Sequence, residues 1–410
     1  MLSQKDNELL TRVGPGTPMG ELMRRYWIPA AFSHQIAEPG SPPVRVKLLG
    51  EKLVVFRDSN GRVGLIDERC PHRTASMYFG RNENCGLRCV YHGWLFDIEG
   101  NCIDLPSEPP GSTLMRKVKI KAYPCLERGG VVWTYMGPKE LQPEFPDLEW
   151  TRIPASHRHM SRHIQECNWL QGFEGGFDTS HLSFLHSGTA DHTVSAVPSR
   201  YEVVGTDFGF ICGTGRDLPN NEVSWTANVM LMPFHKIIGS TPAGAHVWVP
   251  MDDENTMLYS VDFVPNRPMT DEEMKRSRDY RGIHTENIPG TDRAIANKDN
   301  DYLIDRALQA GGTSYTGMKG LGIQDCAIQE SMGPIADRSI EHLGVSDTAI
   351  IKIRRILLQT LKDHAEGKPL PGLDPASWRV RSARFKAPAT APFADNMDAH
   401  VRLEKLMAAG

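Results

Sequence analysis

Cys70-Pro71-His72 and Cys89-Val90-Tyr91-His92, two stretches separated by the sixteen residues 73–88, decide how the first third of this 410-residue chain folds. Each stretch supplies one thiol and one imidazole. In an iron–sulfur cluster held by two cysteines and two histidines, one iron has neutral ligands, so the cluster accepts an electron more readily and its reduction potential rises. The spacing predicts such a cluster between two tight loops at the tips of β-hairpins.

A structural zinc site is the alternative interpretation, because two cysteines and two histidines also suit a tetrahedral ion. The spacing argues against zinc. Only Pro71 separates Cys70 from His72, whereas paired zinc ligands usually have at least two residues between them. Pro71 fixes its own φ, and Gly93 permits close approach of the backbone after the second pair, so both residues suit tight loops.

A second group of possible metal ligands lies in residues 178–186, with the sequence DTSHLSFLH. Non-haem Fe(II) that activates O₂ is held by two histidines and one carboxylate. On a regular helix His181 and His186 would point roughly 140° apart, so His186 is expected at a helix end, in a loop or past a distorted turn. Asp178 and His181 can be neighbours on one helical face. Two histidines that only fill a core are the alternative.

The third ligand has to come from a distant carboxylate. Asp325, in the stretch GIQDCAIQE at residues 322–330, is the preferred candidate, and Glu330, Asp337 and Glu341 compete with it. If Asp325 has no metal role, it is expected in the first turn of a helix, where the helix dipole favours a carboxylate.

Three further motifs accompany these candidates: GPGTPMG at residues 14–20, ECNW at 166–169 and QESMGP at 329–334. Together the motifs resemble the oxygenase (alpha) components of Rieske non-haem iron enzymes that hydroxylate or dealkylate aromatic compounds, specifically the phthalate dioxygenase-like group. The resemblance spans nearly the whole chain. It implies an α+β protein in which an all-β Rieske [2Fe–2S] domain precedes a helix-grip-like catalytic domain built on an antiparallel sheet.

The resemblance also implies a role for each candidate residue. One iron of the cluster would be held by Cys70 and Cys89 and the other by His72 and His92, while His181, His186 and Asp325 would hold the mononuclear Fe(II). Asp178 would link the two centres within a homotrimer or a trimer-based hexamer, in which the cluster of one subunit lies near the iron of the next. Asn168 and Glu174 are expected to support the iron site.

The sequence pattern predicts two domains. Residues 1–150 hold an N-terminal helical segment and the Rieske domain, whose core runs from about 44 to 138, and residues 151–410 form the catalytic domain. In the first domain strands are expected at 44–48, 53–56, 63–66 and 131–136. The proline-rich stretch 138–154 predicts the boundary.

In the second domain strands are expected at 201–204, 222–230 and 257–263, and a helical segment at 270–310. Ser346 is expected to cap a helix through Leu361. Apolar residues recur along that helix at helical spacing and are expected in the core: Ile350, Ile353, Leu357 and Leu361.

Composition limits the partners. A net charge of −4 and a pI near 6.4 give no basic patch for nucleic acid. No apolar stretch approaches the roughly 18 residues that span a bilayer, and residues 1–10 have no apolar signal region, so a cytoplasmic protein is expected. The six cysteines outside the cluster motifs are expected as reduced thiols. Without a Rossmann glycine turn or a P-loop, electrons from NAD(P)H must arrive through a separate flavin and iron–sulfur reductase or a ferredoxin.

The expected function is that of a terminal oxygenase in aromatic catabolism or xenobiotic degradation, which uses O₂ for ring hydroxylation or N- or O-dealkylating monooxygenation. Residues 187–263 contain only Arg200, Arg216 and Lys236 as cations, and a neutral or weakly polar aromatic substrate is therefore favoured. The expected cavity wall is apolar: Leu182, Phe184, Leu185, Phe210, Ile211, Val229, Met230, Met232, Phe234 and Trp248.

Three alternative functions stay open at this point. A dioxygenase that cis-dihydroxylates a phthalate-type aromatic carboxylate is the nearest, because the same metal set serves it. A Rieske electron-transfer protein without oxygenase chemistry is more remote, since the cluster would need little more than the first third of the chain. A zinc hydrolase is the third.

Overall fold

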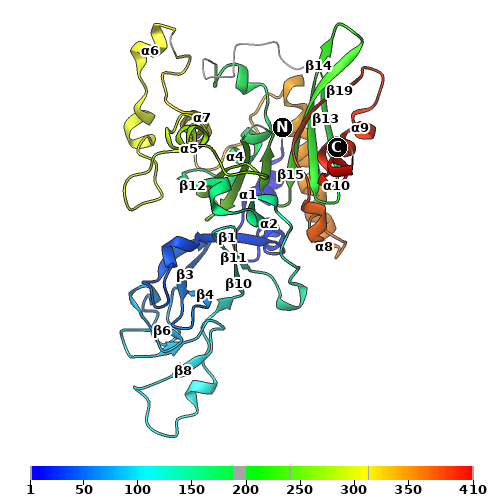
Figure 1. Ribbon diagram of the computed structural model, residues 1–410. Coiled ribbons are helices and arrows are strands. Elements are labelled where there is room, and N and C mark those ends of the chain that lie inside the picture. The colour runs from blue at the N-terminus through cyan, green and yellow to red at the C-terminus, as the bar shows by residue number, and fades with distance from the viewer. Residues whose placement is uncertain (1, 188–199, 240–241, 313, 409–410) are drawn as a thin grey trace. The chain divides into compact units, whose positions relative to one another are not determined.

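The computed structural model describes residues 2–187, 200–239, 242–312 and 314–408 (Figure 1). These residues form two compact units. The smaller unit consists of residues 14–16 and 23–143, and the larger of residues 1–13, 17–22 and 144–410, so the first helix belongs with the second part of the chain. Among the described residues, no helix has the length and apolar character needed to cross a membrane.

The smaller unit contains three antiparallel sheets. Their strand orders are β1-β11-β10, β2-β3-β4-β9 and β5-β6-β7-β8. The strands are β1 Trp27–Phe32, β2 Val44–Leu48, β3 Glu51–Arg57, β4 Val63–Asp67, β5 Arg81–Glu83, β6 Gly86–Arg88, β7 Leu95–Phe96, β8 Cys102–Asp104, β9 Ala122–Tyr123, β10 Cys125–Arg128 and β11 Val131–Tyr135. Most neighbours in a sheet are also neighbours in sequence, as short hairpin connections require.

The core of the smaller unit lies directly beneath the two cysteine loops. Phe56 on β3 and Phe96 on β7 are fully buried, and Cys70 and Cys89 belong to the same buried cluster of side chains. Protein cores pack at nearly crystalline density. The backbone at the base of each loop is therefore held by close packing.

The larger unit is built on one eight-stranded antiparallel sheet. Its strand order is β12-β18-β17-β16-β15-β14-β13, and β19 pairs with β15 off this path. The strands are β12 Arg158–Gln165, β13 Arg200–Gly205, β14 Gly209–Leu218, β15 Glu222–Leu231, β16 His235–Ile238, β17 Ala243–Pro250, β18 Thr256–Phe263 and β19 Ala383–Pro388.

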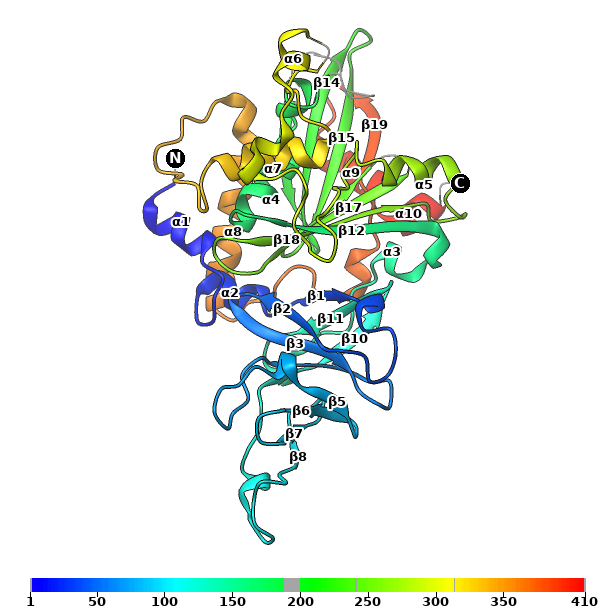
Figure 2. The same cartoon turned by 90° about the vertical axis from the view of Figure 1, so that its left-hand side faces the viewer.

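Helices cover both faces of this sheet. Helices α4 and α7 lie on one face, and α9 and α10 on the other (Figures 1 and 2). The helices are α1 Gln4–Thr11, α2 Pro18–Met23, α3 Glu149–Arg152, α4 Trp169–Phe177, α5 Asp271–Arg278, α6 Arg306–Ala310, α7 Leu321–Ser331, α8 Thr348–Ala365, α9 Phe393–Val401 and α10 Leu403–Ala408.

Small residues let α4 approach the sheet closely. A Cβ added at Gly172 or Gly176 would lie within 2.6 Å of the indole ring of Trp248 on β17, so neither position has room for a side chain. Gly172 and Gly176 are four positions apart and therefore share one face of the helix. Because α4 carries the chain directly into residues 178–186, this packing fixes where the candidate iron ligands begin.

Most of the expected strands are present, since each of the named runs falls largely within an observed strand. Two helical predictions were wrong. Residues 270–310 do not form one helical segment, because α5 ends at Arg278 and α6 begins at Arg306, with turns and a short 3₁₀ segment between them. Ser346 does not cap α8, whose N-cap is Asp347. The apolar stripe of α8 is buried as expected: Ile350, Ile353, Leu357 and Leu361.

Candidate metal centres

The two cysteine loops of the smaller unit have the same backbone hydrogen bonds. The carbonyl oxygen of Cys70 accepts from the N–H of Thr74, and that of Cys89 accepts from Gly93, each at 2.9 Å. The N–H of Cys70 donates to Ala75 at 2.9 Å, and the N–H of Cys89 donates to Trp94 at 2.8 Å. The fifth residue of each loop has a positive φ, 61° at Thr74 and 77° at Gly93. Each cysteine is thus presented by the same tight turn.

The four candidate cluster ligands face one another in pairs. Cys70 and Cys89 are both buried, and their thiols form a hydrogen-bonded pair. The rings of His72 and His92 meet edge to face, with centroids 4.3 Å apart. The indole of Trp94 stacks on His72 at a centroid distance of 4.4 Å and an interplanar angle of 14°. The sequence analysis did not identify this contact of Trp94.

These side chains fit an iron–sulfur cluster. Nδ1 of His92 is buried and has no hydrogen-bond partner among the described residues. The bond from the Cys70 thiol, helped by the backbone amides of Tyr91 and His92, lowers the pKa of Cys89 to about 6, while the pKa of Cys70 is raised. Amide donors aimed at sulfur stabilise the thiolate form that a cluster requires. The donor set is two sulfurs and two imidazoles, as the spacing predicts.

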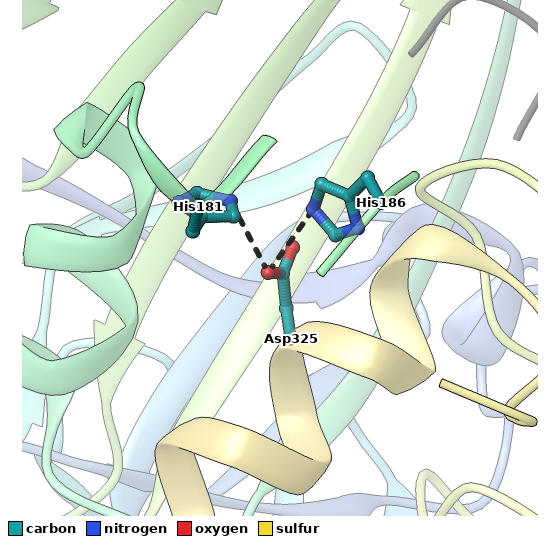
Figure 3. Close-up of side chains that lie close together, drawn as sticks. All are labelled: His181, His186 and Asp325. Atoms are coloured by element: carbon teal, nitrogen blue, oxygen red, sulfur yellow. Dashed lines mark ion pairs between the residues drawn. The ribbon is translucent and has the colours of Figure 1, made fainter. Parts of the chain in front are cut away.

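In the larger unit, His181, His186 and Asp325 form a group of possible metal ligands. One donor atom from each lies within 4.8 Å of the other two. The Oδ1 oxygen of Asp325 is 3.7 Å from Nε2 of His181 and 3.4 Å from Nε2 of His186. Figure 3 shows the carboxylate of Asp325, on the α7 ribbon, between the two imidazoles. Two imidazole nitrogens and one carboxylate are the donors that suit non-haem Fe(II).

The chain changes conformation between the two histidines, as their spacing predicts. Helix α4 ends at Phe177, His181 opens the 3₁₀ helix η6 (His181–Ser183), and His186 lies in the turn that follows. Asp178 and His181 are neighbours, as their spacing allows, with 3.5 Å between the Asp178 carboxylate and Nδ1 of His181. They do not share one regular helix, because Asp178 is the C-cap of α4 and His181 opens η6.

Gln324 orients His186, a contact that sequence reasoning missed. The side-chain oxygen of Gln324 lies 2.7 Å from Nδ1 of His186. The amide nitrogen of Gln324 donates to Thr316 Oγ1 and to the carbonyl of Met318, each at 3.1 Å, which fixes the orientation of the amide. Because the Gln324 oxygen can only accept, Nδ1 of His186 carries the proton and Nε2 is left with its lone pair towards Asp325.

Asp178 does the same for His181. Its Oδ2 oxygen lies 3.5 Å from Nδ1 of His181, and its Oδ1 oxygen accepts a 2.7 Å bond from the Ser180 N–H. Burial alone would raise the pKa of Asp178, but the contacts with His181 and Ser180 outweigh burial, and the pKa is lowered. An ionised Asp178 favours the His181 proton on Nδ1, and Nε2 of the same ring is directed at Asp325.

The competing carboxylates have other partners. Glu330 accepts a 2.7 Å bond from the Tyr302 hydroxyl, and Glu341 pairs with Arg354 at 2.6 Å. The exposed carboxylate of Asp337 accepts a hydrogen bond from the backbone N–H of Ser339. Asp325 is the fifth residue of α7, so the alternative interpretation, in which it stabilises the first helical turn, does not hold. Of these four residues, only Asp325 is within ligand distance of the histidines in the described part of the chain.

The two expected supporting residues act through α4 instead of touching the ligands. Asn168 is the N-cap of α4 and accepts from the Leu170 N–H. Glu174 accepts hydrogen bonds from the buried guanidinium groups of Arg338 and Arg354. Burial would raise the pKa of Glu174, but the two arginines hold it below its ordinary value. One end of α4 is thus capped, and the turn before Asp178 is held by a buried ion network.

Two family models match this chain. The model of the Rieske [2Fe-2S] domain matches residues 26–124, and the model described as LigXa C-terminal domain like matches residues 134–204 and 220–400. Together the two models cover both metal-ligand regions.

Two curated relatives are similar over almost their whole length. The 3-chlorobenzoate-3,4-dioxygenase oxygenase subunit of Comamonas testosteroni is 40% identical over 95% of this chain and 96% of its own. The phthalate 4,5-dioxygenase oxygenase subunit of Pseudomonas putida is 38% identical over 94% of this chain and 92% of its own.

A solved structure shares the fold. The oxygenase in the oxygenase–ferredoxin complex of carbazole 1,9a-dioxygenase has a TM-score of 0.60 and 20% identity, over 89% of this chain and 98% of that chain. The predicted fold class, antiparallel Rieske sheets followed by a mixed helix and sheet catalytic domain, is confirmed. The chain is a member of the Rieske non-haem iron oxygenases, as an oxygenase (alpha) component whose cofactors are a [2Fe–2S] cluster and a mononuclear iron supplied with electrons by a reductase.

Proposed function

We propose that this protein is the terminal oxygenase of a multicomponent system that oxidises an aromatic compound, by ring hydroxylation or by N- or O-dealkylation. The observation that carries the proposal is the convergence of His181, His186 and Asp325 next to Asp178, in a chain that also has a Rieske domain. The two curated relatives are named for aromatic substrates.

The proposal assigns each candidate ligand a role. Cys70 and Cys89 hold one iron of the cluster and His72 and His92 the other, and the thiol pair and the edge-to-face imidazoles support this division. The mononuclear iron is held by His181, His186 and Asp325. We also propose the domain division near residue 150, with the cluster on its N-terminal side.

The residues of this chain prepare the iron site. When bound, the mononuclear iron activates O₂ with electrons that reach it from the cluster. Gln324 and Asp178 each hold a ligand histidine in the tautomer that leaves Nε2 unprotonated. Gln324 lies on α7 and Asp178 caps the end of α4, and both helices cover the same face of the sheet, so the geometry of these two groups is set before a substrate binds.

The electron supply and the assembly follow the family. A separate reductase or ferredoxin delivers electrons that originate from NAD(P)H, and the protein works in the cytoplasm as a homotrimer or a trimer-based hexamer in the breakdown of aromatic compounds. Asp178 bonds His181 on one side. In a trimer its carboxylate bonds a cluster histidine of the neighbouring subunit and gives the electron a short route between the centres.

The first experiment is anaerobic metal analysis of the purified protein, with EPR before and after reduction by dithionite. About three irons and two sulfides per chain, with a Rieske-type signal, are expected. The His181→Ala variant should keep the cluster signal and lose oxygen uptake with reductase and aromatic substrate. Full oxygen uptake in that variant would reject the proposed role of His181. A wild-type protein whose cluster is reduced without any substrate-dependent oxygen uptake would favour an electron carrier, and zinc in place of iron would reject both.

A further inference from the structure

A row of polar side chains crosses one face of the large sheet, and the function proposed above does not use it. Ser161 on β12 is paired directly with Ser260 on β18, and Ser260 is paired with His246 on β17. Directly paired residues of antiparallel strands point to the same face. His163 is two positions after Ser161 and shares this face, and its Nε2 lies 3.2 Å from the Cys326 thiol of α7. The row is therefore on the side of the sheet that α7 covers.

The outer end of the row is a chain of hydrogen bonds that reaches solvent. The Ser161 hydroxyl lies 2.6 Å from Nδ1 of His284, and Nε2 of His284 lies 3.1 Å from Oδ2 of Asp262. His284 is 1% exposed, whereas the side chain of Asp262 is 21% exposed. The Ser277 hydroxyl of α5 donates to the same oxygen of Asp262 at 2.6 Å. A carboxylate at the surface is thus connected through a buried imidazole to a hydroxyl inside the protein.

The protonation states of this chain allow a proton to move along it. Burial alone would raise the pKa of Asp262, but its bonds with His284 and Ser277 outweigh burial, and the pKa is lowered. Because an ionised carboxylate can only accept, Nε2 of His284 carries a proton and donates it to Asp262. Nδ1 can then accept from the Ser161 hydroxyl or, when His284 takes up a second proton, donate to it. His284 can therefore pass a proton inwards.

The other titratable groups around His284 do not compete for this proton. The ring of His159 lies edge-on to His284, with centroids 4.7 Å apart. Burial lowers the pKa of His159 to about 4, and Arg278 of α5 acts in the same direction. Burial also lowers the pKa of His163 to about 4 and that of His246 to about 3. These three imidazoles are neutral at pH 7, and the described residues place no second carboxylate within ion-pair distance of His284.

Ser260 connects the outer chain to His246. Its hydroxyl lies 3.2 Å from Nδ1 of His246 and donates to the carbonyl oxygen of Ile283 at 3.3 Å. The bond to Ile283 is longer than the roughly 2.7–2.8 Å that is usual between a hydroxyl and an oxygen, so it holds the hydroxyl weakly. The Cβ atoms of directly paired residues are about 4.5–5.5 Å apart. Rotation about χ1 of Ser260 can therefore bring its hydroxyl to that of Ser161.

His246 is the inner end of the row and lies close to the candidate iron ligands. It is paired directly with Lys236, whose ammonium donates to the carbonyl oxygen of Gly176 near the end of α4. Burial is the main cause of the low pKa of His246, and the charge of Asp325 opposes it, which requires the two side chains to be near each other. Because His246 stays neutral, it can accept a proton at Nδ1 only while it gives one up at Nε2.

The proposed reaction consumes protons that the electron route does not deliver. Monooxygenation converts a substrate RH, O₂, two electrons and two protons into ROH and water, and ring dihydroxylation uses the same electrons and protons to form a diol. The electrons pass through the cluster, whereas the protons released from NAD(P)H stay in solvent. A proton moves only between groups in hydrogen-bond contact, so the iron site needs a connected path for protons.

We propose that this row is a route that delivers protons from solvent to the mononuclear iron site. Its members, from the outside inwards, are Asp262, His284, Ser161, Ser260 and His246. The inference rests on the oxygenase function proposed above. For each proton taken up at the outer end, every N–H or O–H bond along the route breaks as the next one forms, and one proton leaves Nε2 of His246. A row that only satisfies buried hydrogen-bonding groups, with protons supplied by water at the iron, is the competing interpretation.

The test measures proton uptake and electron transfer in one turnover. Enzyme with both metal centres loaded and reduced is mixed, in weak buffer, with O₂ and an aromatic compound. This compound is the one that gives wild type its fastest oxygen uptake in a panel of benzoates, anisoles and N-methylanilines. A pH-indicator dye reports proton uptake, and the absorbance of the cluster reports electron transfer, in H₂O and in D₂O. Iron content, the EPR signal of the Fe(II)–nitric oxide complex and the melting temperature show whether each variant keeps the site.

In Ser161→Ala, proton uptake and reoxidation of the cluster should both slow by at least about 10-fold, with a larger solvent isotope effect than in wild type. Ser161→Thr keeps the hydroxyl and should stay within about threefold of wild type. Asp262→Asn removes the charge at the outer end and should also slow proton uptake. The double variant should be no slower than the slower single variant, because both changes block one route. Ser377→Ala, at a buried serine that donates to the carbonyl of Asp374, is the matched control.

Failure of this inference differs from failure of the proposed function. Wild-type rates of proton uptake in Ser161→Ala and Asp262→Asn, in enzyme that oxygenates the compound, would overturn the route and leave the oxygenase function standing. Slowing without a larger isotope effect, together with loss of iron or a lower melting temperature, would show a structural row and overturn the route as well. If wild type with both metals takes up no O₂ with any member of the panel, the oxygenase function fails and the route fails with it.

Discussion

Gln324 is the residue that determines which nitrogen of His186 can bind a metal. Its amide is fixed by two bonds of its own, to Thr316 and Met318, so its oxygen has one orientation available. Gln324 precedes Asp325 on α7, and one short segment therefore supplies a candidate ligand and the group that orients another candidate ligand. Outer contacts of this kind are as much a part of a metal site as its ligands.

Replacing Gln324 with Leu is expected to weaken Fe(II) binding by about 10–100-fold, because His186 loses the acceptor that keeps its proton on Nδ1. The measurement is an anaerobic Fe(II) titration of the metal-free mononuclear site against a competing chelator. Gln359→Leu, at an exposed glutamine of α8, should bind iron as wild type does. Equal iron affinity in Gln324→Leu and wild type would contradict the role.

Replacing Asp178 with Asn should preserve both metal centres and lower kcat by at least about 100-fold. The amide can accept one bond, but it no longer holds the His181 proton through a charge, and it breaks the proposed link between the centres. Iron and sulfide content, together with reoxidation of the reduced cluster in a single turnover, separate loss of metal from loss of transfer. Asp395→Asn, exposed on α9, is the control. Normal turnover in Asp178→Asn would refute the link.

At the scale of elements, α4 depends on a buried ion network. Glu174 lies one turn before Asp178. Its carboxylate accepts a 2.6 Å hydrogen bond from Arg354 Nε and a 3.0 Å hydrogen bond from Arg338 Nη2. The side chains of the two arginines are at most 4% exposed. A network this deep ties α4 to α8 and to residue 338, so the position of the candidate ligands depends on contacts well outside the site.

Glu174→Gln is expected to lower the free energy of unfolding by about 3–5 kcal/mol, because two buried guanidinium groups lose a shared counter-charge. Urea denaturation at pH 7 measures the loss. Glu272→Gln, in an exposed pair with Arg276, should change the same free energy by less than about 0.5 kcal/mol.

The pH dependence of this loss has a fixed sign. Since the pKa of folded Glu174 is below its ordinary 4.5, its ionisation stabilises the protein above pH 4.5, and this contribution is lost as pH falls towards the folded pKa. The difference between wild type and Glu174→Gln should therefore shrink below pH 4.5. A difference that grows with acid would be inconsistent with the network.

The second cysteine loop needs glycine at residue 93 for two reasons. Gly93 has a φ of +77°, and a Cβ there would lie 2.6 Å from Cγ of Pro106. Gly61 has a similar φ of +80° but no atom within 4 Å of an added Cβ. In Gly93→Ala and in Gly61→Ala the new residue would have a left-handed backbone conformation, which costs about 1–2 kcal/mol. Only Gly93→Ala should also lose cluster iron and sulfide. Equal cluster content in the two variants would show that the close contact is unimportant.

At the scale of the whole molecule, removal of the mononuclear iron should destabilise the larger unit and leave the cluster in place. A ligand that binds only the folded state stabilises it by about 2.7 kcal/mol at one hundred times its dissociation constant. Treatment with a ferrous chelator should lower the melting temperature, and Fe(II) should restore it. The same treatment of His186→Ala should have no effect. Loss of the Rieske signal on chelation would contradict independent centres.

The sequence predicted correctly those structural features that depend on local residue patterns. The run at 44–48 is a strand with those same bounds, because its extended β-branched residues need only a neighbouring strand. The break between His181 and His186 followed from helical geometry alone. The segment 279–297 could not be predicted as irregular from its polarity, since polar helices and polar loops have similar composition.

Contacts between distant segments could not be predicted from one sequence. Gln324 and His186 are 138 positions apart, and nothing in either local pattern specifies the other. Lys236 was counted among three cations, but its place beside Gly176 depends on how β16 pairs within the sheet and on where α4 crosses it.

The matched turns around Cys70 and Cys89 bear on the speed of electron transfer. An electron that enters or leaves the cluster changes its charge, and every nearby group that must shift in response adds to the reorganisation energy of the step. In these loops each cysteine is bonded twice through its own backbone, and Trp94 is stacked on His72. If these loops hold the cluster as proposed, few groups beside it are free to relax, so a small reorganisation energy and rapid electron exchange are expected.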